Sequence, residues 1–188
     1  ETMYKITDKR YLTENIYLMD IEAPRVARAA KPGQFIIIRN DKKGERIPLT
    51  IADYDKEKGT VTIVFQTVGA ATRELAQYEI GDYVEDFAGP LGQPSEMINE
   101  DIDSLKGQNI LFVAGGVGAA PVYPQVKWLY EQGIKAEIRE LKEQNKELHE
   151  MSLWDLIFHR KDFNFSINTE DLEEDVDTKF KSQYNLFE

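Results

Sequence analysis

Apolar and polar residues alternate along the first half of the chain, in short runs separated by turn-forming residues. A period of two is typical of strands that bury one face. The strands expected from this pattern are residues 4–6, 15–21, 34–39, 47–52, 60–66 and 81–88. A single short helix is expected over residues 71–77. Many short strands at this spacing predict a small antiparallel barrel or sandwich.

The second half follows a different pattern, which starts with the uncharged run ILFVA at residues 110–114. Such a run is typical of a strand buried on both faces of a parallel sheet. It leads into a glycine loop at residues 115–118 (GGVG) and then into a segment that suits a helix ending at Gly133. Pro121 and Pro124 are expected in the first helical turn, where backbone N–H groups lack intrahelical acceptors. A strand followed by a crossover helix predicts an α/β domain.

The glycine loop is the first candidate for chemistry. Glycines let a ligand approach bare backbone, and a helix N-terminus behind them favours an anionic group such as phosphate. A tight turn that binds nothing has the same appearance. The loop lacks both the G-x-G-x-x-G spacing of a dinucleotide fingerprint and the Lys-Ser/Thr pair of a P-loop, so NTP hydrolysis is not expected.

Residues 93–107 separate the two patterns. They show little periodicity, and we interpret them as the crossing between two domains. The first domain is expected over residues 1–96 and the second over residues 105–188.

The pattern after Gly133 leaves two interpretations open. A short strand to about residue 141 followed by a helix to Phe158 is favoured over one long helix. Residues 162–168 alternate as a further strand would, and residues 169–177 are interpreted as a solvated acidic turn.

Composition narrows the classes of function. The chain has 188 residues and a net charge of −11, which argues against nucleic acid and anionic membranes as partners. It contains no cysteine, which excludes disulfides, thiol catalysis and cysteine-ligated zinc or iron–sulfur clusters within this sequence. His149 and His159 lie in no cluster with metal-ligand spacing, so no metal site is expected. No run approaches the ~20 apolar residues of a membrane span, and without a visible signal peptide a cytoplasmic protein is expected.

Four motifs resemble the ferredoxin–NADP reductase superfamily in their order and spacing. They are RIPLT at 46–50, VFQTVGAATREL at 64–75, GPLG at 89–92 and AGGVGAAPVYP at 114–124. Within the superfamily the sequence is most similar to the FAD-binding small subunit of electron-bifurcating NADH-dependent ferredoxin:NADP oxidoreductase. The electron-transfer subunit of dihydroorotate dehydrogenase and the small subunit of sulfide dehydrogenase are further relatives. The resemblance covers about residues 3–133. It implies an antiparallel FAD-binding β-barrel followed by an α/β nucleotide-binding domain that is atypical or truncated.

The resemblance also implies which residues bind cofactors. FAD would contact Arg46, Pro48, Leu49, Thr50, Val64, Phe65, Gln66, Gly69, Ala71 and Thr72. The nicotinamide nucleotide would contact Gly115, Gly116, Gly118, Ala120 and Pro121. Thr50 would lie near the reactive edge of the flavin, and no residue is assigned as catalytic. Many relatives carry the arginine directly before the proline, where this chain has Ile47.

The function implied by the resemblance is electron transfer between NAD(H) or NADP(H) and FAD. Because this sequence lacks the family's cysteine-rich [2Fe–2S] segment, onward electrons would pass to a larger flavin and iron–sulfur subunit or to ferredoxin. The family's glycine-containing loop after the next strand is replaced by residues 142–144 (KEQ), and the glutamates nearby would repel a 2′-phosphate. One alternative is a FAD-binding or interaction module without nicotinamide chemistry. Another is an acidic interaction protein without a cofactor.

Overall fold

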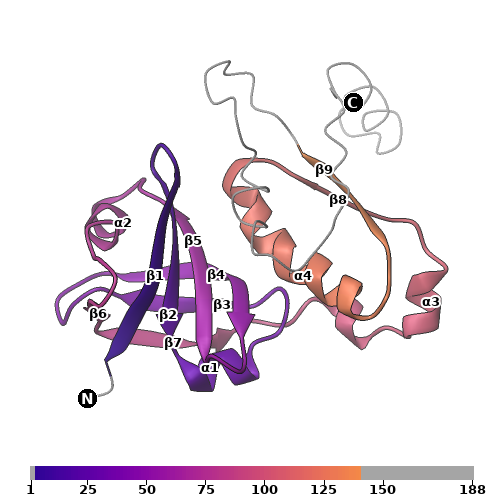
Figure 1. Cartoon of the computed structure of the whole chain (residues 1–188), viewed down its shortest axis with the longest axis horizontal. Coiled ribbons are helices and arrows are strands. Elements are labelled where there is room, and N and C mark those ends of the chain that lie inside the picture. The colour runs from indigo at the N-terminus through magenta and orange to yellow at the C-terminus, as the bar shows by residue number, and fades with distance from the viewer. Residues whose placement is uncertain (1–2, 141–188) are drawn as a thin grey trace, which may run out of the picture.

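The computed structural model describes residues 3–140 and consists of a β-barrel and a smaller α/β part (Figure 1). The barrel strands run in the spatial order β6-β1-β2-β5-β4-β3-β7, and every neighbouring pair is antiparallel. They are β1 (Tyr4–Thr13), β2 (Ile16–Glu22), β3 (Phe35–Arg39), β4 (Arg46–Asp55), β5 (Thr60–Gln66), β6 (Tyr83–Val84) and β7 (Asp86–Leu91). The antiparallel barrel predicted from the alternating pattern is confirmed.

The chain itself brings the two edges of the barrel sheet together. β6 and β7 stand at opposite ends of the strand order, yet a single residue, Glu85, separates them in sequence. The Glu85 N–H donates to the backbone carbonyls of Arg39 and Asn40 at 3.0 and 3.1 Å. The seven strands therefore form a nearly closed barrel, in which closure removes most of the exposed edge.

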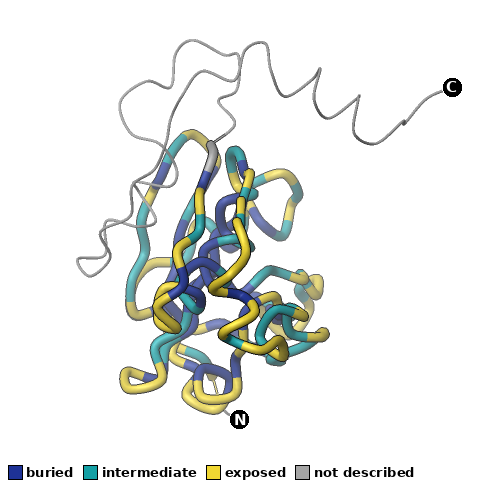
Figure 2. The backbone as a smooth tube through the Cα atoms, turned by 90° about the vertical axis from the view of Figure 1, so that its right-hand side faces the viewer, coloured by how far each residue is buried: buried dark blue, intermediate teal, exposed yellow. Residues whose placement is uncertain are grey.

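Large apolar side chains fill the barrel, as the alternation along the strands requires. Figure 2 marks the buried positions along the backbone in dark blue. The most buried members of the barrel core include Ile6, Met19, Ile21, Ile36, Ile38, Ile51, Val61, Ile63, Phe65 and Phe87. Branched residues suit this position because they fit a pleated, buried surface. The predicted strand at 81–88 is divided in the structure between β6 and β7.

Two short helices cover the barrel. Helix α2 (Ala70–Leu75) lies within the segment predicted as 71–77 apart from its first residue, and Lys9 Nζ donates to the carbonyl of its C-cap residue Ala76 at 2.8 Å. Helix α1 (Pro24–Ala29) was not predicted, although Pro24 at its first position is a typical start signal. It buries Val26 and Ala27 against the barrel core.

The second part is built around helix α4. Its elements are η1 (Glu96–Asn99), α3 (Ile102–Lys106), β8 (Ile110–Ala114), η2 (Gly116–Gly118), α4 (Ala119–Glu131) and β9 (Ala136–Glu140). β8 and β9 are parallel, as predicted for a strand joined to its neighbour by a crossover helix. Residues 93–107, interpreted as an irregular crossing, contain η1 and α3. None of the helices within residues 3–140 is long and apolar enough to cross a membrane.

Two predictions about this part are wrong. β8 is not buried on both faces, because Leu111 and Val113 are 49% and 44% exposed and only Ala114 is fully buried. Pro124 lies inside α4 rather than in its first turn, where Pro121 does lie. A proline there removes one backbone donor from the helix.

Helix α4 packs between the barrel and the β8–β9 sheet (Figure 1). One apolar cluster joins Leu12, Ile16, Leu18, Ala52 and Val64 of the barrel to Ala114, Ala119, Ala120, Tyr123, Val126 and Ile138 of the second part. The assignment of residues 1–96 and 105–188 to two domains stays a prediction. The elements expected over 142–158, 162–168 and 169–177 lie outside the described residues.

The barrel core is tested by truncating Ile63, whose side chain is 0% exposed in the middle of β5. Ile63→Ala removes buried methyl groups and leaves a cavity, so we expect a loss of about 2–5 kcal/mol in the free energy of unfolding, measured by urea denaturation. The control is Val68→Ala, because Val68 is 74% exposed. Equal stability of the two variants would contradict the assignment of Ile63 to the core.

Candidate nucleotide-binding site

The first group of predicted site residues lies at the start of β4. Pro48 is exposed, and Leu49 and Thr50 are half-buried beside β3. Arg46 is also exposed, and its Nη2 lies 3.4 Å from Asp86 Oδ2 on β7. A surface ion pair of this kind contributes little stability, so the guanidinium is free to exchange its partner for another anion.

The second group lies at the end of β5. Val64 and Phe65 are buried, Val64 in the cluster shared with α4 and Phe65 in the barrel core. The Phe65 ring stacks on Tyr17, with ring centroids 5.9 Å apart. The side chains of both residues therefore belong to the core, and they can reach a ligand only through their backbone. Gln66, the last residue of the strand, is exposed.

The third group forms the turn into α2. Gly69 is the N-cap residue, and the Thr72 hydroxyl both accepts a hydrogen bond from the Gly69 N–H at 3.0 Å and donates to the Gly69 carbonyl at 3.1 Å. Asn40 Nδ2 donates to the Ala71 carbonyl at 3.0 Å and ties this turn to the barrel. Thr72 therefore closes the turn on itself, and the first-turn N–H groups that follow Gly69 lack helical acceptors.

The glycine loop forms the fourth group, between β8 and α4. Gly116 has a φ of +53°, in the left-handed region that favours glycine. Gly115 and Gly118 have ordinary negative φ values of −137° and −63°. Ala120 is buried in the cluster shared with the barrel, whereas Pro121 is half-buried in the first turn of α4. The loop is thus fixed to the barrel through the helix that follows it.

The fold brings the four groups to one side of the barrel. Ile51 pairs with Ile63 and Asp55 with Thr60, so the start of β4 lies beside the end of β5, from which the chain enters the turn into α2. Ala52, two residues after Thr50, packs in the same cluster as Ala114, Ala119 and Ala120 around the glycine loop.

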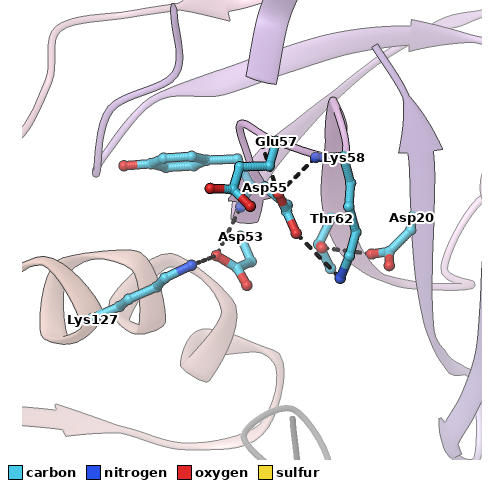
Figure 3. A network of polar contacts seen from close by, with 8 residues as sticks. Asp20, Asp53, Asp55, Glu57, Lys58, Thr62 and Lys127 are labelled. Carbon is cyan, nitrogen blue, oxygen red and sulfur yellow. Dashed lines mark hydrogen bonds and ion pairs between the residues drawn. The ribbon is translucent and has the colours of Figure 1, made fainter. Parts of the chain in front are cut away.

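A polar cluster at the other end of β4 was not predicted (Figure 3). Lys127 Nζ of α4 lies 2.8 Å from Asp53 Oδ1, and the same oxygen accepts the Tyr54 N–H at 2.8 Å. The pKa of the Tyr54 hydroxyl is raised to about 12, chiefly by burial and to a smaller extent by the negative charges of Glu131 and Asp53. Asp53 and Lys127 are 74 residues apart in sequence, and no local pattern indicates that they meet.

No side chain crowds the backbone at the two turns. A Cβ built on Gly69 would meet only the Thr72 hydroxyl, at 3.9 Å, and one built on Gly118 would meet no atom within 4 Å. The backbone at both turns is therefore open to a ligand, which is what the close approach of a phosphate requires. Within residues 3–140 no group of three or more His, Asp or Glu residues is placed to hold a metal ion.

Comparison with known proteins gives relatives but no matching family model. The chain is 69% identical over 146 residues to an uncharacterised protein of Clostridium beijerinckii. The alignment covers 78% of this chain and 49% of that protein. The chain is 43% identical over 129 residues to a Thermotoga maritima homologue of the electron-transfer subunit of dihydroorotate dehydrogenase B (NAD⁺). That alignment covers 69% of this chain and 43% of the homologue. The solved structure of an NADH-dependent reduced ferredoxin–NADP oxidoreductase, studied for flavin-based electron bifurcation, aligns with a TM-score of 0.66 and 39% identity. That alignment covers 74% of this chain and 48% of the solved chain. The chain thus spans about half the length of these relatives.

The raised pKa of Tyr54 predicts a stability change at alkaline pH. Its hydroxyl has a pKa of about 12 in the folded protein against 10.0 for a free tyrosine, so between these values the native state holds a proton that the unfolded state has lost. This contribution is therefore fully present below pH 10 and is lost as the pH rises towards 12. Tyr54→Phe should flatten the fall in unfolding free energy over this window, measured by urea denaturation at stepped pH. Tyr11→Phe, with a ring that is 62% exposed, is the control. The same slope for Tyr54→Phe and wild type would contradict the prediction.

Proposed function

Because the chain belongs to the ferredoxin–NADP reductase superfamily, we propose that it forms the flavin-binding portion of an electron-transfer subunit. In this proposal electrons move between a nicotinamide nucleotide and FAD. FAD, when bound, supplies the chemistry by accepting a hydride equivalent, and the protein supplies binding and orientation. No acid–base pair or nucleophile is needed for such a transfer.

The barrel would hold FAD between the start of β4 and the turn into α2. The exposed Pro48 and the half-buried Leu49 and Thr50 offer a firm surface for the flavin ring, because they are paired with β3 on a strand of the barrel. The first-turn N–H groups after Gly69 would bind the diphosphate, with Thr72 holding the turn in shape. Arg46 would add a positive charge by leaving Asp86.

The glycine loop would hold the nicotinamide nucleotide at the N-terminus of α4. Gly115, Gly116 and Gly118 would let the diphosphate approach the backbone, and the partial positive charge of the helix N-terminus favours an anion there. Ala120 and Pro121 would set the direction of the first turn.

The observation that carries the proposal is the junction between the two turns. Ala52 of β4 lies in the same buried apolar cluster as Ala119 and Ala120 of α4, and this cluster joins the helix behind the glycine loop to the strand that would carry the flavin. Two rings that exchange a hydride must be held face to face at a short distance. The alternative function, a FAD-binding or interaction module without nicotinamide chemistry, needs no such junction.

In this proposal electrons leave the chain for a partner. We propose a larger subunit with flavin or iron–sulfur centres, or ferredoxin, as that partner. The similarity to an electron-transfer subunit supports this assignment. A cytoplasmic location stays a prediction.

The proposal predicts that a methyl group added at either open turn weakens the binding of one nucleotide and not of the other. Gly69→Ala should weaken FAD binding about tenfold or more, a loss of roughly 1.4 kcal/mol, and leave the fold intact because the new Cβ meets nothing closer than 3.9 Å. Gly118→Ala should weaken NADH binding to the FAD-loaded protein by a similar factor and leave FAD affinity unchanged. Flavin fluorescence measures the first affinity, and titration with NADH under anaerobic conditions measures the second.

The control for both variants is Gly107→Ala. The Cβ of that alanine would meet Ser104 O at 3.5 Å, an ordinary contact, at the end of α3. If purified wild-type protein retains no FAD after incubation with it, as judged by the absorption spectrum, the whole proposal is wrong. Bound FAD that NADH cannot bleach would remove only the reductase activity and support the alternative module.

A further inference from the structure

The ion pair between Lys127 and Asp53 joins α4 to the barrel away from the glycine loop (Figure 3). The two side chains are 20% and 11% exposed, whereas the nearby pair Lys58–Asp55 is 79% and 35% exposed. An ion pair that is largely shielded from water is less screened, and its geometry is more constrained, than one on the surface.

Asp53 is itself held in place on β4. Its Oδ1 accepts the N–H of the next residue, Tyr54, at 2.8 Å as well as the Lys127 ammonium. The Lys127 ammonium also lies over the Tyr54 ring, with Nζ 5.8 Å from the ring centroid. Lys127 therefore contacts both a carboxylate that is hydrogen-bonded to its own strand and an aromatic ring.

The apolar contacts between α4 and the barrel combine large side chains, such as Leu18 and Tyr123, with small ones. They are made in part by alanines, Ala52 on β4 and Ala119 and Ala120 on α4. Apolar burial is non-directional, and small flat side chains interlock less than large ones. The Lys127–Asp53 pair adds a directional contact at a second point along the helix.

The pair lies far enough from the glycine loop that a small rotation of α4 about it would displace the loop. Lys127 is nine residues beyond Gly118, which corresponds to about 13 Å along the helix axis. Asp53 is three residues beyond Thr50, or about 10 Å along β4. A rotation of α4 of about 10° around the pair would move the glycine loop by roughly 2 Å, and a misplacement of about 1 Å can cost on the order of 100-fold in rate.

We propose that Lys127 and Asp53 form a positioning pair, which sets the angle of α4 on the barrel and so the distance between the glycine loop and the start of β4. For catalysis the inference rests on the proposed function. The placement of α4 itself does not depend on any cofactor.

The placement is tested without cofactor, by measuring a distance across the junction. The 188-residue sequence contains no cysteine, so spin labels can be attached to cysteines introduced at Gln77, after α2, and Gln132, after α4, both of which are exposed. Pulsed electron paramagnetic resonance of the full chain should give one narrow distance distribution. Lys127→Met and Asp53→Asn should broaden or shift it.

Three further variants decide what a change means. Lys58→Met removes the exposed pair in the neighbouring turn and should leave the distribution unchanged. Lys127→Arg retains the charge and should restore the narrow distribution. Asp53→Leu combined with Lys127→Met leaves no charge without a partner, so it should fold even if the single variants do not, and it should still broaden the distribution. An unchanged distribution in the double variant would overturn the proposal.

The catalytic consequence is read from the FAD-loaded protein by stopped-flow mixing with NADH. Lys127→Met should lower the rate of flavin reduction about tenfold or more, while the Kd values for FAD and NADH change by less than about threefold, because the binding groups remain. A broadened distance with an unchanged reduction rate would overturn the catalytic role of the pair. Absence of FAD binding in wild type would instead remove the proposed function, and the distance measurement would still decide the placement of α4.

Discussion

The packing of α4 against β4 is the contact on which the arrangement of the molecule depends. Without it, the barrel and the β8–β9 sheet would be two small units joined by residues 92–109. A two-stranded parallel sheet is not stable alone, and it needs a helix on at least one face. Helix α4 meets that need on one side and contacts the barrel on the other, so one apolar cluster serves both parts.

The chemistry of the contact explains how this surface could serve a redox site. Alanines at 52, 119 and 120 allow close approach, and the glycines before α4 leave the adjacent backbone open. Close approach and open backbone are both needed where two nucleotides meet. The largely shielded Lys127–Asp53 ion pair adds a directional contact farther along α4.

Much of the barrel could be predicted from sequence, because a strand with one buried face repeats every two residues. The run at 60–66 matches β5 at both ends. The pattern could not show which faces of β8 are covered, since an uncharged run records only that its residues are apolar and Leu111 and Val113 remain exposed. The ion pair between Lys127 and Asp53 was equally invisible, because it depends on how α4 lies on the barrel. The predicted cofactor contacts depended on family motifs, and the structure shows that Val64, Phe65 and Ala120 are buried in apolar clusters.

The central claim is that two open turns on one side of the barrel bind two diphosphates and bring their rings together. A crystal structure of the protein with FAD and NAD⁺ tests it most directly. The account predicts the FAD diphosphate against the N–H groups that follow Gly69, the flavin ring against Pro48 to Thr50, and the NAD⁺ diphosphate at Gly115 to Gly118. A flavin bound elsewhere on the chain, or a nicotinamide ring that lies away from the flavin face, would contradict it.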